Sequence, residues 1–190
     1  IMTYISDVDS HIRGFKPGNL VIVAGRPGMG KSAFVTTILT NMALNNVPCA
    51  LFSLEMEMEE VAGRVMANIN NIPLDYIVHK DLRGKFFESA MEGISKVNKM
   101  PLYIDDTAGI SLPNLRSKLR RMVQKYGISA AVVDYMQLMN SDYKDGRSRE
   151  NEVTELSKGL KQLAKELKIP IIALSQLSRK VEDRATKRPM

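Results

Sequence analysis

GRPGMGKS, residues 25–32, is the most informative segment of this 190-residue chain, because it fits the phosphate-binding pattern G-x-x-x-x-G-K-[ST]. The apolar run LVIVAG at 20–25 predicts a buried strand before it, and AFVTTILTNMAL at 33–44 predicts a helix after it. Glycines let the intervening loop wrap a phosphate group with main-chain N–H groups, and the helix N-terminus adds its positive dipole. The sequence therefore predicts a nucleoside triphosphate site.

The segment 25–32, called the phosphate loop below, assigns roles to individual residues. Lys31 reaches the β- and γ-phosphates, and Ser32 can supply a hydroxyl ligand to Mg²⁺. We expect the nucleotide to contact the whole loop and the residue after it: Gly25, Arg26, Pro27, Gly28, Met29, Gly30, Lys31, Ser32 and Ala33.

Further apolar stretches alternate with helical patterns along the chain. Strands are predicted within 49–55, 101–106, 129–138 and 169–175, and helices at 112–125 and 150–168. Ser111 and Gly127 resemble the N-cap and C-cap of the first of these helices. Alternating strands and helices pair in parallel through right-handed crossovers. We therefore expect one α/β domain over 1–190, with a mainly parallel sheet flanked by helices on both faces.

One carboxylate is placed to hold a metal ion beside the phosphates. Asp134 ends the apolar strand AAVVD and fits the Walker B arrangement, in which the acid binds the Mg²⁺ water shell. Asp105 and Asp106 are a rival pair, but adjacent residues point to opposite faces of a strand. We interpret that pair as a feature of the turn at the strand end.

Hydrolysis also needs a group that orients and deprotonates water. Glu55 ends the strand CALFSLE, which we expect to neighbour the strand of the phosphate loop. It could equally cap the helix that begins near Met58. Gln176 follows the strand IIALS and can sense the γ-phosphate, or it can satisfy a main-chain group at the strand end. From the residues alone, both alternatives stay open.

Composition excludes several classes of protein. No apolar run is long enough for a transmembrane helix, and the N-terminus IMTYISDVDS lacks the pattern of a secretory signal. The first residue is Ile1, so we interpret the chain as a fragment of a longer protein. Cys49 is the single cysteine, which excludes an internal disulfide and fits a reducing cytosol. Because His11 and His79 stand apart from it, no zinc site is supported.

The positive charge is unevenly placed. Lysine and arginine number 27 against 21 acidic residues, for a net charge of +6. The segment 111–126 and the tail 179–190 hold the excess, and clustered cations suit a polyanion partner. A solvated helix face and a polar tail would give the same pattern. Two polar loops, 140–150 and 178–190, directly follow predicted strands, where ligands gather in parallel sheets.

Five linked segments identify a family. GRPGMGKS, FSLEM, YIDDT, VVDYMQL and ALSQLSR, in this order, resemble the RecA-like motor domain of DnaB-type replicative helicases. The lead-in DVDSHIRGFKPGNLVIVAG matches as well, so the resemblance covers essentially 1–190. It implies an ATP-driven DNA helicase of the cytoplasm that assembles as a homohexameric ring around single-stranded DNA and works with a primase and a helicase loader.

The resemblance also implies roles for single residues. Glu55 would activate the attacking water, Asp134 would be the Walker B acid, and Gln176 would couple the nucleotide state to a DNA-contacting loop. Arg64, on the helix after FSLEM, could face a neighbouring subunit or could equally lie on the surface. Candidate DNA contacts lie in the two polar loops: Arg147, Arg149, Arg179, Lys180 and Arg184. No aromatic residues alternate with these cations, so binding should tolerate any base sequence.

The chain also departs from the family pattern. The resemblance implies that the family's arginine finger and much of its DNA-contacting loop would follow residue 190, and that a primase-binding N-terminal domain would precede residue 1. Two other functions remain open: a RecA-like recombination ATPase that forms filaments, and an ATP-dependent switch or scaffold that does not translocate.

Overall fold

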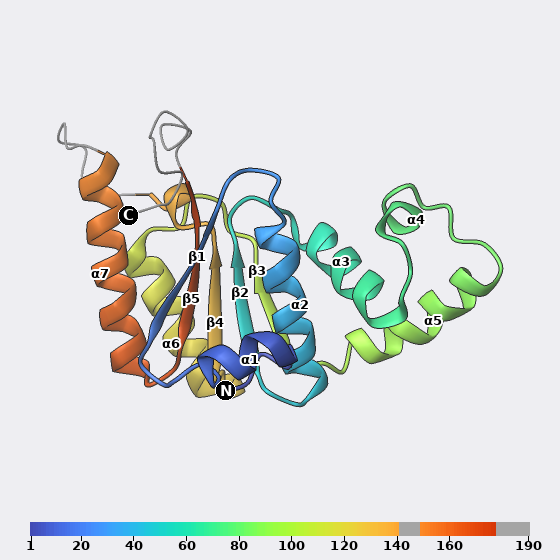
Figure 1. Ribbon diagram of the computed structural model, residues 1–190, viewed down its shortest axis with the longest axis horizontal. Helices are drawn as coiled ribbons and strands as arrows, with labels where there is room; N and C mark the ends of the chain where they lie inside the picture. The colour runs from blue at the N-terminus through green and yellow to red at the C-terminus, as the bar shows by residue number, and fades with distance from the viewer. Residues whose placement is uncertain (141–148, 178–190) are drawn as a thin grey trace.

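A computed structural model describes residues 1–140 and 149–177, with the backbone alone at 149 and 150. These residues form a five-stranded, wholly parallel sheet with the strand order β1-β5-β4-β2-β3 (Figure 1). The strands are β1 Leu20–Gly25, β2 Cys49–Ser53, β3 Leu102–Asp105, β4 Ala130–Asp134 and β5 Ile171–Gln176. The expected parallel α/β sheet is confirmed.

Helices cover both faces of the sheet, as predicted (Figure 1). Their bounds are α1 Ser6–Ile12, α2 Lys31–Leu44, α3 Met58–Asn70, α4 Leu74–Val78, α5 Lys85–Val97, α6 Leu112–Tyr126 and α7 Arg149–Leu167. Leu119 of α6 and Leu160 of α7 belong to the core on one face, whereas Ile38 of α2 and Val61 of α3 belong to the core on the other. Helices α4 and α5 extend away from the sheet beyond α3 (Figure 1).

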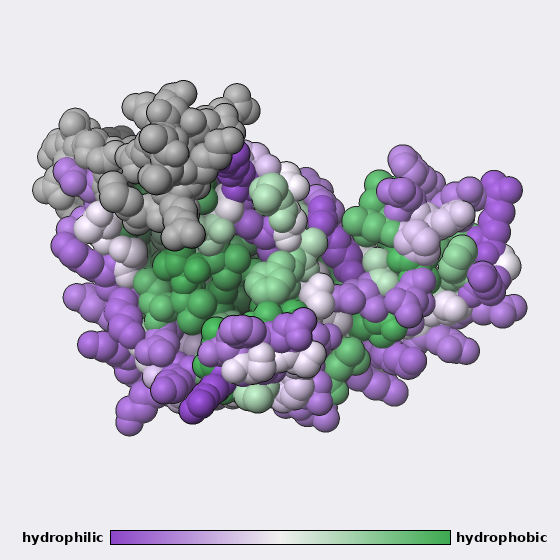
Figure 2. All heavy atoms as spheres, viewed as in Figure 1, coloured by the Kyte–Doolittle hydropathy of each residue, from purple (hydrophilic) through white to green (hydrophobic). Residues whose placement is uncertain are grey.

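The central strands are apolar because both of their faces are covered. Every residue of β2 and β4 is buried. Alternate side chains of β2 divide between the two cores, with Phe52 in one and Leu51 in the other. By contrast, β1 lies at the edge of the described sheet and leaves Ile22 44% exposed. Figure 2 shows an apolar area where β1 runs in Figure 1.

The strand predicted within 129–138 ends at Asp134, as the Walker B pattern predicts, and the chain then turns into a short 3-10 helix, η1, at Met136–Leu138. One predicted boundary is wrong. The first polar loop was expected to run to 150, but α7 begins at Arg149. Gly127 ends α6 in the left-handed conformation at φ 67°, which confirms it as the C-cap. Ser111 occupies the N-cap position, yet its side chain makes no capping hydrogen bond.

The strand order corrects one neighbour relation. β2 does not lie beside β1, because β5 and β4 separate them. Glu55 therefore approaches the phosphate loop from across two strands. Within the described ranges, no helix is both long and apolar enough to cross a membrane.

Candidate nucleotide-binding site

A cleft of about 490 Å³ lies at the carboxyl ends of the strands. It is lined by Pro27, Gly28, Gly30, Lys31, Ser32, Ala33, Glu55, Met56, Glu60, Arg64, Asp134, Tyr135 and Gln176. The carboxyl ends of parallel strands meet at one edge of a sheet, so residues distant in sequence converge there. The cleft brings together the side chains predicted for phosphate, metal and water: Lys31, Ser32, Glu55, Asp134 and Gln176.

Backbone conformation explains the glycines of the phosphate loop. Gly28 and Gly30 have φ of 73° and 81°, a region that strains residues with a Cβ atom. At Gly25 a Cβ atom would stand 3.3 Å from the Lys31 side chain, so this glycine allows a close approach. Gly25, Arg26 and Met29 do not line the cleft, and Met29 is 74% exposed.

Helix α2 points its N-terminus into the cleft, because it begins at Lys31 and its first three residues are part of the lining. The first main-chain N–H groups of a helix have no partner within it and are available to an anion. The Lys31 Nζ donates to the Arg26 carbonyl oxygen at 3.0 Å, which holds the ammonium group over the loop. This edge of the cleft can therefore bind phosphate with both main-chain and side-chain donors.

Asp134 has the environment expected of an indirect metal ligand. It is 3% exposed, and its Oδ1 atom has no hydrogen-bond partner among the described residues. Burial raises the pKa of the Asp134 carboxyl group, and the negative charge of Glu55 raises it further. The hydrogen bond with the Ser32 hydroxyl and the positive charge of Lys31 lower the same pKa, but the net shift is upward. A buried carboxylate oxygen without a partner, beside a hydroxyl, fits the water shell of Mg²⁺.

The protein supplies few metal ligands of its own at this position. The described residues contain no group of three or more His, Cys, Asp or Glu side chains that could hold a metal ion. A magnesium ion here would therefore take much of its coordination from phosphate oxygens and water, as Mg²⁺ bound with nucleotides usually does.

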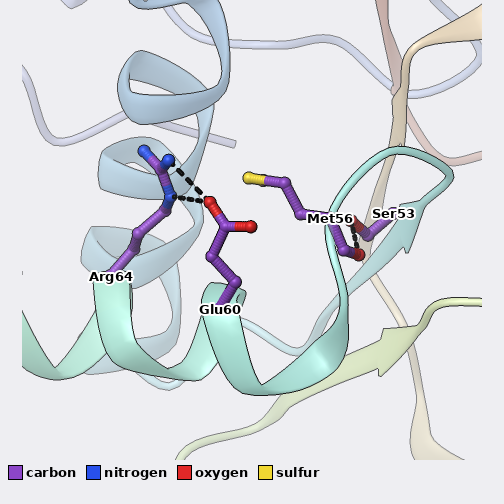
Figure 3. A network of polar contacts seen from close by, with 4 residues as sticks. All are labelled: Ser53, Met56, Glu60 and Arg64. Atoms are coloured by element: carbon purple, nitrogen blue, oxygen red, sulfur yellow. Dashed lines mark hydrogen bonds and ion pairs between the residues drawn. The ribbon is translucent and has the colours of Figure 1, made fainter. Parts of the chain in front are cut away.

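A tight turn carries Glu55 from the end of β2 into the cleft. The Ser53 Oγ donates to the Met56 carbonyl oxygen at 2.7 Å (Figure 3), and the Leu54 N–H donates to the Asp134 carbonyl oxygen at 2.7 Å. The second bond ties this turn to the end of β4. As a result, Glu55 and Asp134 line the same cleft from two neighbouring strands.

The capping role left open for Glu55 belongs to another residue. Helix α3 begins at Met58, and the Met58 N–H donates to Oδ2 of Asp106 at 3.1 Å. Asp105 accepts the Thr107 N–H at 3.1 Å and pairs with Lys118 at 2.6 Å. Neither aspartate lines the cleft, so their interpretation as features of the strand end is confirmed.

Arg64, for which the sequence leaves a surface and an interface position open, lies in the cleft. Its Nη2 atom lies 2.8 Å from Oε1 of Glu60, one turn earlier on α3 (Figure 3). The Arg64 side chain is 28% exposed and lowers the pKa of Asp134. Glu60 and Arg64 are four residues apart and so share one face of α3, but only the fold shows that this face borders the cleft.

Gln176 ends β5 directly beside the phosphate loop. It is paired in register with Gly25, and the Leu177 N–H donates to the Gly25 carbonyl oxygen at 3.1 Å. The end of β5 is therefore hydrogen-bonded to the first residue of the phosphate loop.

The predicted DNA contacts lie largely outside the described residues. Arg147, Arg179, Lys180 and Arg184 all do, and Arg149 is described only as the first backbone position of α7. The described strands β4 and β5, each of which precedes one of the two polar loops in sequence, end at the edge of the sheet that holds the cleft.

Curated relatives resemble the whole of this chain but are much longer. Replicative DNA helicase DnaB of Nostoc sp. is 41% identical over 187 residues, which is 97% of this chain and 21% of that protein. Replicative DNA helicase DnaB of Geobacillus stearothermophilus is 38% identical over 191 residues, covering 100% of this chain and 42% of that protein. The chain thus spans less than half of either relative.

Solved structures share the fold closely. One solved ATPase domain matches with a TM-score of 0.90 and 34% identity, over 99% of this chain and 67% of that chain. A DnaB-like replicative helicase, described with its interactions with primase, matches with a TM-score of 0.88 and 35% identity, over 97% of this chain and 45% of that chain. The family model for the DnaB-like helicase C-terminal domain matches residues 1–190. Because that match runs from end to end, the chain belongs to the family of DnaB-like helicase C-terminal domains.

Proposed function

We propose that this chain is the ATPase motor domain of a replicative DNA helicase, which couples ATP hydrolysis to movement along single-stranded DNA and to duplex unwinding at the replication fork. The observation that carries the proposal is the convergence of Lys31, Glu55 and Asp134 in one cleft at the carboxyl edge of the sheet. Membership of the DnaB-like family supports it.

Each residue would act on ATP in a way that its position allows. Lys31 binds the β- and γ-phosphates and offsets charge that develops during phosphoryl transfer. Ser32 holds Mg²⁺ by its hydroxyl, and Asp134 holds it through water; the ion supplies charge neutralisation at the phosphate oxygens. Glu55 orients the attacking water and accepts its proton. Gln176 contacts the γ-phosphate and passes its presence to the second polar loop.

The larger assembly belongs to the same proposal. We infer that the full-length protein forms a homohexameric ring, binds single-stranded DNA through the two polar loops, and works in the cytoplasm with a primase and a loader. The excess of cations in 179–190 supports a DNA partner, and the interactions described for a DnaB-like relative support the primase. A neighbouring subunit would supply the arginine that completes the site.

ATP hydrolysis by the full-length protein, with and without single-stranded DNA, tests this function. We expect DNA to stimulate turnover, and we expect Glu55→Gln to lower it about 100-fold or more, because the amide cannot accept the proton. Glu57→Gln is the matched control, because Glu57 lies two residues from Glu55 and outside the cleft lining. We expect this variant to hydrolyse ATP at the wild-type rate. Robust hydrolysis that ignores DNA would favour a nucleotide switch, and open filaments on DNA would favour a recombination ATPase.

A further inference from the structure

The last residues of β5 extend beyond the end of its neighbour β4. β4 pairs with β5 only as far as Val133 and Ala173, whereas β1 continues alongside to Gln176. Beyond Asp134 the β4 chain leaves the sheet and forms η1. One side of Ser175 and Gln176 therefore lacks the main-chain partners of a neighbouring strand.

The direction of the main-chain groups shows which residue needs a partner there. Successive residues of a parallel strand bond alternately to the strands on either side. The N–H groups of Ile171 and Leu177 donate toward β1, to Asn19 and Gly25. Gln176 has the opposite parity, so its N–H and C=O groups point away from β1, toward η1.

The side-chain amide of Gln137, on η1, fills this position. Its Oε1 accepts the Gln176 N–H at 3.3 Å, and its Nε2 donates to the Gln176 carbonyl oxygen at 3.2 Å. Nε2 also donates to the Ser175 Oγ at 2.9 Å. A primary amide offers an acceptor and two donors. Here the acceptor and one donor replace the peptide groups of a neighbouring strand at Gln176, and the amide nitrogen also donates to the Ser175 hydroxyl.

Gln137 also sits between the parts of the site that must communicate. η1 leads into the first polar loop, and Gln176 stands directly before Leu177 and the second. η1 itself is anchored by buried Met136 and Met139. The bonds of Gln137 thus join a fixed element to the residue that is paired with the start of the phosphate loop.

We propose that Gln137 is a positioning residue: it holds the Gln176 main chain against the phosphate-loop strand and so links the two polar loops to ATP turnover. This inference rests on the proposed motor function. Gln137 does not line the cleft, so its effect on the reaction would pass through Gln176.

Gln137→Met separates positioning from packing. Methionine has nearly the shape of glutamine but cannot form these hydrogen bonds. In the full-length protein we expect this variant to lower DNA-stimulated kcat about tenfold, with the KM for ATP within about threefold of wild type. Gln162→Met, at an exposed position on α7, should leave both values unchanged. Normal DNA-stimulated kcat in Gln137→Met, or a loss that appears only in Gln137→Ala, would show a packing role and overturn the proposal.

Amide hydrogen exchange tests the same contact without relying on activity. Loss of the Oε1 acceptor should speed exchange of the Gln176 N–H about tenfold in Gln137→Met, while Ile172, deep in the strand, stays protected. Unchanged exchange at Gln176 would overturn the proposal. If wild-type hydrolysis ignores DNA, the motor function fails, and faster exchange still supports the positioning of Gln176. If DNA stimulates wild type and Gln137→Met equally, only the Gln137 proposal fails.

Discussion

Asp134→Asn should stabilise the fold while it weakens the binding of Mg²⁺ and ATP. The carboxylate is buried, its Oδ1 atom has no hydrogen-bond partner among the described residues, and burial raises its pKa. The folded protein therefore bears the cost of a charge that the unfolded chain would solvate. Asparagine keeps the shape and removes the charge.

The expected size of this stabilisation follows from the geometry. A buried polar group without a partner costs about 1–3 kcal/mol, and because the amide still leaves polar atoms in place, we expect a gain of about 1 kcal/mol. For a protein of this size that raises Tm by about 2–4 °C. Magnesium and ATP at about 100 times Kd stabilise wild type by about 2.7 kcal/mol. A tenfold loss of affinity in the variant removes about 1.4 kcal/mol of that gain, so the order of the two proteins reverses.

Thermal unfolding with and without Mg²⁺ and ATP measures both effects. The pH dependence has a defined sign: a raised pKa means that wild-type stability falls as pH rises through the range directly above 3.8, the ordinary value of this carboxyl. The advantage of asparagine should therefore shrink in more acidic buffer. Asp105→Asn is the matched control. It removes a carboxylate that is paired with Lys118, so the loss of this ion pair should make the variant less stable than wild type. Lower Tm in Asp134→Asn without nucleotide, or equal stabilisation of both proteins by nucleotide, would refute this reasoning.

Two further predictions concern the backbone and the core. Gly30→Ala places a Cβ atom at φ 81° with open space around it, so we expect backbone strain alone, a loss of about 1 kcal/mol in unfolding free energy, and weaker binding of a fluorescent ATP analogue; undiminished Tm and affinity would contradict this. Cys49 is fully buried and its pKa is raised to about 12, so a thiol reagent should modify it only after denaturation. Rapid labelling of the native protein at neutral pH would show that the core around β2 opens readily.

Part of the site could be predicted because it is local. The phosphate loop needs a strand, glycines that accept positive φ, and a helix that begins at Lys31, and all of these are continuous in sequence. Similarly, adjacent Asp105 and Asp106 could be set aside against Asp134, because neighbouring side chains of a strand point to opposite faces. The family resemblance added the expectation for Glu55, which no local pattern could separate from a cap.

The sequence alone was sufficient to establish the strand–loop–helix unit, the alternation of strands and helices, and the chemistry of the residues at the strand ends. Those properties depend on side-chain periodicity and on the conformational freedom of glycine within a few residues. Only the tertiary structure decided that β5 and β4 separate β1 from β2, that Asp106 caps α3, that Arg64 enters the cleft, and that Gln137 completes the end of β5. Each of these depends on which strands become neighbours and where one ends before the other, and hydrogen bonds between distant segments have no signature in local sequence.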